Sequence, residues 1–392
     1  MMRYADVSQA MKARLAETPG KERVGSLDAL RGFNFVWILG GDGILLALDW
    51  MLQGKNPTAS AIAHFFAIQV QHVPWEGFRF YDLVFPMFVF ITGVAIPLSL
   101  PQLVERDGRL RAHVRVLRRV VLLYVLGLIF YGGIKGGWQD IRFLGVLQRI
   151  AICYLFAAVL FLNFNWRVLV ATFVALLAGY WALLSFVPVP CCGAGWFLPD
   201  GNLANFIDAL FLPGRLFDRT SDPEGLLSTL PAIATCLAGV FAGLLLREKR
   251  VAPQAKVYWL LGAGIVSIAA GYLWSLQFPI IKYLWTSSFV LVTAGWSAVL
   301  LGAFYQVVDV WGYRRWATVF VWIGANAILL YCLNGFFGFE PFALRFVGGD
   351  FGKWLDQAVT PGAGMFVAHL VGFTFVVMLA GYLYRRKVFL RV

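Results

Sequence analysis

The sequence predicts an all-α polytopic membrane protein with about ten transmembrane helices and with cytoplasmic N- and C-termini. Hydrophobic residues make up 60% of the 392 residues and charged residues only 14%, against roughly a quarter in ordinary soluble domains. Long apolar stretches recur along the chain without the polar alternation of barrel strands, and a lone segment in lipid must satisfy its backbone polar groups as a helix. These features exclude a soluble enzyme and, despite the net charge of +12, a nucleic-acid binder.

Ten stretches are long enough to cross a hydrocarbon core of about 30 Å, which takes about 20 helical residues. In chain order they are 29–50, 81–101, 116–133, 143–161, 168–187, 229–246, 257–276, 287–308, 316–333 and 364–384. The first, second, fourth and ninth carry polar residues, which are treated below as candidates for function.

Lysine and arginine are distributed unequally between the segments that join the spans. If residue 1 is cytoplasmic, most of the 33 fall on cytoplasmic segments, chiefly before the first span, between the second and third, and after the last. Positive charge is retained on the cytoplasmic side of membrane proteins. The charge pattern therefore favours an even number of spans with both termini inside.

The chain divides into a tail and one membrane domain. Residues 1–24 are polar and lack the apolar core of a signal peptide, so we expect a cytoplasmic tail followed by a single transmembrane domain, 25–392. The outer loops are 51–80, 188–228 and 334–363. In the first of these, apolar residues at helical spacing between 59 and 71 predict a short helix at the membrane interface.

Ionisable and amide side chains in or beside spans are costly, and each has a structural and a functional interpretation. The candidates are Asp42, Asp82, Gln148, Arg149, Lys282 and Asn326. Asp82 either caps the second span or holds a partner, and Arg149 either pairs with an acid such as Asp82 or binds an anionic ligand. Lys282 either snorkels to the interface or enters a site, and Asn326 either bridges helices or binds a ligand.

Histidines and cysteines offer few further candidates. His72 follows the predicted interfacial helix near the outer mouth of the bundle, and His64 on that helix is its competitor. Three cysteines, Cys153, Cys236 and Cys332, fall in spans as packing residues, while Cys191 and Cys192 are adjacent in an outer loop. No metal-ligand spacing occurs, so we expect no metal.

Seven short motifs, in order along 24–384, resemble those of the heparan-α-glucosaminide N-acetyltransferase family, in particular its bacterial NagX-type members. They are Ser26-Leu27-Asp28-Ala29-Leu30-Arg31-Gly32, His72-Val73-Pro74-Trp75-Glu76-Gly77, Asp82-Leu83-Val84-Phe85-Pro86, Gly145-Val146-Leu147-Gln148-Arg149-Ile150, Asp222-Pro223-Glu224-Gly225, Lys282-Tyr283-Leu284-Trp285-Thr286 and Gly324-Ala325-Asn326-Ala327. Each motif is short, but their shared order and sidedness make the resemblance specific.

The resemblance implies an enzyme of the cell inner membrane, a homodimer, that moves acetyl from cytoplasmic acetyl-CoA to the amine of a glucosamine-type sugar on the periplasmic side. It places the catalytic histidine at His72. An asparagine of the family falls at Asp42, where this chain departs from the pattern. Asp42 then orients His72, holds the acceptor ammonium or stays protonated. Cofactor-binding residues are expected among Arg31, Gln148, Arg149, Lys282, Trp285 and Asn326, and Arg118 and Arg119, with Arg31, either pair with the phosphates or only retain positive charge inside.

Two mechanisms and two competing functions stay open at this point. His72 either deprotonates the amine for direct attack on the thioester or forms an acetyl-imidazole intermediate. The competing functions are a transporter of a sugar or small anion, which ten spans with buried charges also fit, and an O-acyltransferase acting on an envelope glycan.

Overall fold

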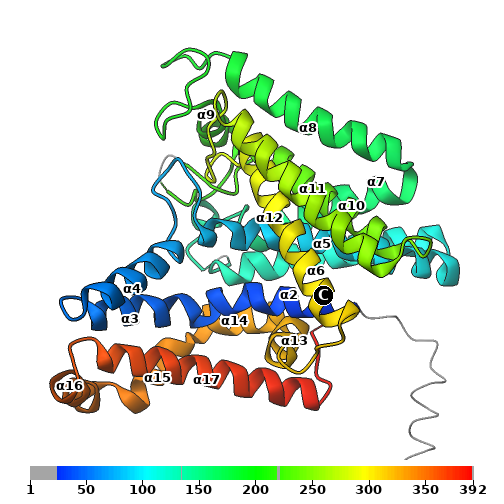
Figure 1. Ribbon diagram of the computed structural model, residues 1–392. Coiled ribbons are helices and arrows are strands. Elements are labelled where there is room, and N and C mark those ends of the chain that lie inside the picture. Colours follow the sequence, from blue (N-terminus) through cyan, green and yellow to red (C-terminus); the bar gives the residue numbers. More distant parts are fainter. Residues whose placement is uncertain (1–23, 134, 219–220, 391–392) are drawn as a thin grey trace, which may run out of the picture.

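The computed structural model describes residues 24–133, 135–218 and 221–390 (Figure 1), so the predicted cytoplasmic tail lies, apart from Val24, outside the described residues. Within these ranges the chain is helical, with three isolated β-bridges in place of any sheet. The prediction of an all-α membrane protein is confirmed.

Eight helices in the described part of the chain are long and apolar enough to cross a membrane. The first is a rod of three pieces, α2 (Gly25–Val36), η1 (Trp37–Gly41) and α3 (Asp42–Leu52). The others are α5 (Phe80–Asp107), α7 (Val146–Asn163), α8 (Trp166–Phe186), α10 (Thr229–Arg247), α11 (Pro253–Trp274), α12 (Ser287–Tyr305) with its extension η3 (Gln306–Val310), and α17 (Ala363–Arg385).

The two remaining predicted spans have a different form. The ninth is broken into α13 (Thr318–Ala325) and α14 (Ala327–Phe337), which meet at an angle of 74° around Asn326. The third is a helix, α6 (Arg109–Phe130), but it begins before the predicted span and includes five arginines in its first half. Its apolar part is therefore shorter than the other spans. Among the described residues, eight helices, or nine if the broken pair is one span, are long and apolar enough to cross a membrane, rather than the predicted ten.

Short helices occupy the predicted outer loops. The predicted interfacial helix is α4 (Pro57–Gln69), and its Ile62, Phe65 and Phe66 side chains are between 50% and 59% exposed, as expected for a helix that offers an apolar face to lipid. The loop 188–228 is largely irregular around α9 (Leu203–Phe211). The last outer loop forms α15 (Phe339–Val347) and α16 (Gly349–Ala358).

The helices form two groups with α5 between them. In Figure 1 the blue helices α2 to α4 lie beside the orange and red helices α13 to α17, while α8, α11 and α12 lie on the opposite side. The helix α5 packs against α10, α7 and α12 and, over a smaller contact, against α2. The largest buried apolar cluster joins α5 to α7, α10 and α12, so a cavity beside α5 has one densely packed wall.

Candidate active site

His72 lies in the short loop between α4 and α5, and both ends of that loop are tied down. The Arg79 guanidinium donates to the His72 backbone carbonyl at 3.2 Å, and the Phe80 backbone N–H donates to the Gln69 side-chain carbonyl at 3.2 Å. The histidine is thus held above the first turn of α5, with 43% of its side chain exposed.

Asp82, in the first turn of α5, binds the imidazole directly. Its Oδ1 lies 2.8 Å from Nδ1 of His72, and its Oδ2 accepts from the backbone N–H groups of Arg79 at 3.1 Å and Val73 at 3.3 Å. The Asp82 side chain is fully buried. A carboxylate so fixed favours the tautomer with hydrogen on Nδ1, which leaves a lone pair on Nε2. Asp82 therefore both caps α5 and orients the histidine.

Lys282 approaches the same ring from the other half of the chain. Its Nζ lies 2.8 Å from Nδ1 and 2.9 Å from Nε2 of His72, and 3.6 Å from Oδ1 of Asp82. A bridge between Glu76 and Ile281 joins the two loops. Burial lowers the pKa of Lys282, although the charges of Asp82 and Glu224 oppose this effect. A snorkelling lysine keeps its charged end in water. The Lys282 side chain is only 15% exposed, so the predicted snorkelling role does not fit.

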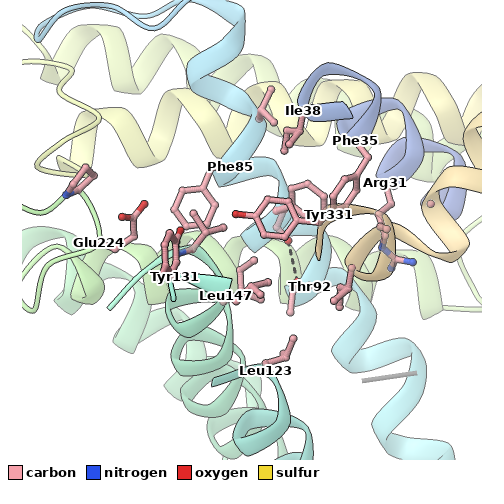
Figure 2. Close-up of a pocket in the computed structure, with 18 of the residues that line it drawn as sticks. Arg31, Phe35, Ile38, Phe85, Thr92, Leu123, Tyr131, Leu147, Glu224 and Tyr331 are labelled. Atoms are coloured by element: carbon pink, nitrogen blue, oxygen red, sulfur yellow. Dashed lines mark hydrogen bonds between the residues drawn. The ribbon is translucent and has the colours of Figure 1, made fainter. Parts of the chain in front are cut away.

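A cavity of about 450 Å³ opens beside this cluster and follows α5. The α5 residues that line it share one helical face: Tyr81, Val84, Phe85, Phe88, Thr92 and Ala95. Fourteen residues of helix correspond to about 21 Å. His72, Lys282 and Glu224 line one end, and Arg31 and Arg119 line the other. In Figure 2, Glu224 and Arg31 lie on opposite sides of a stretch that contains Phe85, Tyr131 and Tyr331.

A buried charge cluster supports the His72 end of the cavity. The Arg142 guanidinium donates to Oε2 of Glu224 at 2.6 Å and to Oδ1 of Asp222 at 3.2 Å, and all three residues are less than 9% exposed. Arg142 also lies over the ring of Tyr131, 4.5 Å from its centroid. Burial raises the pKa of Glu224. The cluster places a carboxylate on the cavity wall within reach of a hydroxyl or ammonium group.

Asp42 reaches the histidine through a tyrosine. It is the first residue of α3, just after the π-helical turn in which Gly40 adopts a φ of 118° that other residues rarely take. Its Oδ2 accepts from the Tyr81 hydroxyl at 2.9 Å, and the Tyr81 ring centroid lies 4.7 Å from that of His72. Asp42 is not among the cavity-lining residues.

The other predicted ligand residues divide between the cavity and its wall. Arg31 lines the cavity while its Nη1 donates to Asp28 at 3.0 Å. Gln148, Arg149, Trp285 and Asn326 are buried and do not line the cavity. At the break between α13 and α14, the neighbours of Asn326, Ala325 and Ala327, line it instead.

Arg149 has structural partners. Its Nη2 donates to the Gly225 carbonyl at 3.1 Å and to the Ser228 hydroxyl, and its guanidinium lies 5.0 Å from the centroid of Trp285. The predicted pair with Asp82 does not form, because Asp82 is bonded to His72. Nearby, Gln148 donates to the Arg142 carbonyl at 3.3 Å, so both residues brace the loops that carry the charge cluster.

Four site residues were not identified as such from the sequence: Tyr81, Tyr131, Arg142 and Glu224. Tyr81 precedes Asp82, and Glu224 belongs to the Asp-Pro-Glu-Gly motif, so both had a local signal. Arg142 and Tyr131 lie in the loop after α6, where nothing in the sequence indicates that they face Glu224.

The chain is similar to one described family and to curated proteins. Residues 23–183 match a family described as a domain of unknown function (DUF5009). The chain is 28% identical over 381 residues to heparan-alpha-glucosaminide N-acetyltransferase of Homo sapiens, a match covering 82% of this chain and 56% of the relative. It is 30% identical over 332 residues to the Mus musculus enzyme of that name, covering 69% and 50%. The chain spans about half the length of these curated relatives. Over most of its own length, the chain is a homologue of the heparan-alpha-glucosaminide N-acetyltransferases.

Proposed function

We propose that this protein is a transmembrane acetyltransferase that moves acetyl from cytoplasmic acetyl-CoA to the amine of a glucosamine-type sugar on the periplasmic side. The observation that carries the proposal is the cavity along α5, with an oriented imidazole at one end and two guanidinium-bearing residues at the other. The names of the relatives support the acetyl group and the glucosamine acceptor.

The donor is expected to lie extended along α5. Arg31 and Arg119 would pair with the phosphates of the nucleotide, because guanidinium groups form strong charge-assisted hydrogen bonds with phosphate. The apolar and aromatic middle of the cavity suits the pantetheine arm. The length of about 21 Å then brings the thioester to the His72 end while the nucleotide stays at the Arg31 end.

The chemistry requires a base for the acceptor amine. Nε2 of His72 takes a proton from the amine as its nitrogen attacks the thioester carbonyl, and Asp82 stabilises the imidazolium that forms. A C–N bond forms, the C–S bond breaks, and the imidazolium returns the proton to the CoA sulfur. Glu224, on the cavity wall, would bind the hydroxyl or ammonium groups of the sugar. Asp42 would hold Tyr81 against the imidazole.

The test uses the purified protein in proteoliposomes with acetyl-CoA and glucosamine, and mass spectrometry of the product. His72→Ala should lower turnover by about 10²–10⁴-fold, the usual contribution of a positioned base. His64→Ala is the matched control, because His64 pairs with Asp49 on the neighbouring helices α4 and α3 and does not line the cavity. Equal loss in both variants would contradict the assignment of the base.

Kinetics with both substrates varied distinguish the two routes. Direct attack predicts intersecting double-reciprocal lines, whereas parallel lines would indicate an acetyl-imidazole intermediate on His72. Uptake of labelled glucosamine without any acetylated product would instead contradict the proposed reaction and favour a transporter.

A further inference from the structure

The amine of Lys282 occupies the position that a nucleophile needs. Nδ1 of His72 is engaged by Asp82, so Nε2 is the nitrogen available as a base, and Nζ of Lys282 lies 2.9 Å from Nε2 and 2.8 Å from Nδ1. A base and the group it deprotonates must be about 2.6–3.2 Å apart. Lys282 and His72 line the same end of the same cavity. A primary amine of the protein therefore lies where the primary amine of an acceptor sugar would be deprotonated.

We infer that Lys282 is a self-acetylation site: when an acetyl thioester fills the cavity and no acceptor sugar is present, His72 directs the acetyl group to Nζ of Lys282. The inference rests on the proposed function, because acetyl-CoA is the co-reactant. It adds a modification site on the protein itself, because the Lys282 side chain carries a primary amine, as the acceptor sugar does.

The step balances without any further reactant. Nζ of Lys282 in its neutral form attacks the thioester carbonyl, and Nε2 of His72 accepts the proton that the amine loses. A C–N bond forms, the C–S bond breaks, and the imidazolium protonates the departing CoA thiolate. The products are an acetamide on Lys282 and free CoA, with His72 neutral again.

Burial makes Lys282 a better nucleophile than a surface lysine. Its lowered pKa gives a larger neutral fraction at pH 7 to 8 than an exposed lysine has. Lys353 provides the contrast, since its side chain is 75% exposed and pairs with Asp350 at 3.5 Å. Lys256 is 7% exposed and donates to the Leu246 carbonyl, away from the cavity.

Acetylation would also change the site. The acetamide has no positive charge, so Asp82 loses a cationic neighbour, and the added acetyl group fills the space beside Nε2 that an acceptor amine requires. An enzyme supplied with donor alone would therefore inactivate itself, and acceptor sugar would protect it by competing for the acetyl group.

The test incubates the full-length protein in proteoliposomes with ¹⁴C-labelled acetyl-CoA, with and without glucosamine. Peptide mapping should locate a stable acetamide on Lys282, because hydroxylamine removes acetyl from imidazole but not from an amide nitrogen. We expect Lys282 to be labelled at least about ten times faster than Lys353. Saturating glucosamine should suppress the labelling of Lys282 and leave that of Lys353 unchanged.

The same labelling is then measured in the His72→Ala variant. We expect labelling of Lys282 to fall by about 10²-fold and labelling of Lys353 to stay unaltered. If the wild-type protein acetylates glucosamine and Lys282 stays unlabelled, the inference is wrong and the proposed function stands. Labelling of Lys282 that glucosamine and His72→Ala both leave unchanged would be non-enzymatic and would overturn it as well. If neither glucosamine nor Lys282 receives acetyl, the proposed function fails along with the inference.

Discussion

At the scale of single residues, the direction of the His72 lone pair follows from one buried carboxylate. Asp82 receives three hydrogen bonds, from the imidazole and from two backbone N–H groups, and is fully buried. Such a carboxylate is held rigidly, so it favours the tautomer with hydrogen on Nδ1 and leaves the lone pair on Nε2. The arrangement is stabilised further by Tyr81, whose ring packs against the imidazole and whose hydroxyl is bonded to Asp42.

Replacing Asp82 by Asn tests this dependence. The amide can present its N–H₂ group to Nδ1, which would favour the wrong tautomer and leave Nε2 protonated. We expect Asp82→Asn to lower kcat by about 10²–10⁴-fold, as loss of a general base does, with little change in the KM for acetyl-CoA. Steady-state kinetics in proteoliposomes measure both parameters.

A second histidine–carboxylate pair supplies the control for that variant. His64 and Asp49 are 3.2 Å apart at the junction of α4 with α3, so Asp49→Asn makes the same chemical change outside the cavity. It should leave kcat within about twofold of the wild type. A larger effect of Asp49→Asn than of Asp82→Asn would contradict the role given to Asp82.

At the scale of the elements, hydropathy predicts the spans well but not how they are broken. Runs of apolar residues gave the positions of α5, α7, α8, α10, α11 and α17, because lipid solvation is a property of the segment itself. Beside the 74° break at Asn326, α13 packs against α2, and Gly324 lies against the Asp28 carbonyl. That contact joins residues about 300 positions apart, so no local pattern contains it.

The same distinction applies to the candidate site. The histidine was predicted because its motif is local, and Lys282 because a cation near a span is conspicuous. Their contact was not predictable, since it requires the loop before α12 to meet the loop before α5. Gln148 and Arg149 were conspicuous for the same reason as Lys282, yet they lie in the wall rather than in the cavity.

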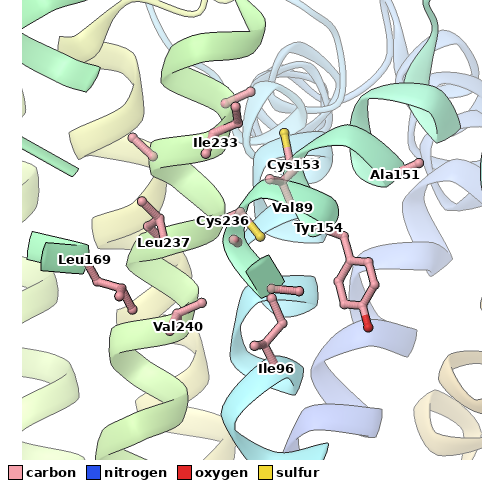
Figure 3. Packing of buried hydrophobic residues seen from close by; sticks show 14 of the residues in the cluster. Val89, Ile96, Ala151, Cys153, Tyr154, Leu169, Ile233, Cys236, Leu237 and Val240 are labelled. Atoms are coloured by element: carbon pink, nitrogen blue, oxygen red, sulfur yellow. The ribbon is translucent and has the colours of Figure 1, made fainter. Parts of the chain in front are cut away.

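Close packing of α5 against α10 forms the rigid side of the cavity. Gly93 of α5 lies against the Cys236 carbonyl of α10, and Gly239 of α10 lies against the Phe90 carbonyl of α5, so each helix approaches the other where it lacks a side chain. Figure 3 shows Val89 and Ile96 of α5 next to Cys236, Leu237 and Val240 of α10. The predicted packing role of Cys153 and Cys236 agrees with their burial there.

The short helix α9 gives a pH-dependent prediction for the irregular outer loop. Asp208 in α9 is 1% exposed, its Oδ1 accepts from the Leu226 backbone N–H at 2.7 Å, and burial raises its pKa to about 6. A carboxyl with a raised pKa stabilises the fold when protonated. This contribution is complete below the ordinary carboxyl pKa of about 4 and is lost as the pH rises through about 6.

Asp208→Asn keeps an oxygen acceptor for Leu226 without the charge. We expect the variant to melt a few degrees above the wild type at pH 7.5, and the difference to shrink as the pH falls through about 6 and to disappear below about pH 4, where Asp208 is protonated in both the folded and the unfolded protein. Thermal unfolding followed by intrinsic tryptophan fluorescence at both pH values measures it. A variant that melts below the wild type at pH 7.5 would show that the ionised form is the stabilising one.

At the scale of the whole molecule, the cavity connects two chemically different ends through one helix face. The Arg31 end has guanidinium groups from α2 and α6, and the His72 end has a base, an amine and a carboxylate from three separate loops. Between them lie aromatic side chains of α2, α5 and α14. This polarity matches a donor with an anionic nucleotide, an apolar arm and a reactive carbonyl, and it assigns separate kinetic roles to the two ends.

Because the two ends of the cavity are separate, we predict that substitutions at the Arg31 end impair activity only when the acetyl donor carries a nucleotide. Arg31→Ala and Arg119→Ala should each raise the KM for acetyl-CoA by about 10–100-fold, the value of one hydrogen bond to a charged group at about 1.5–3 kcal/mol. With S-acetylpantetheine, which lacks the nucleotide phosphates, the same variants should match the wild type. Arg106→Ala is the control, because Arg106 is exposed, pairs with Asp107 and does not line the cavity. Variants that lose activity equally with both donors would show that these arginines support the fold rather than the phosphates, and the proposed direction of the donor along α5 would then be wrong.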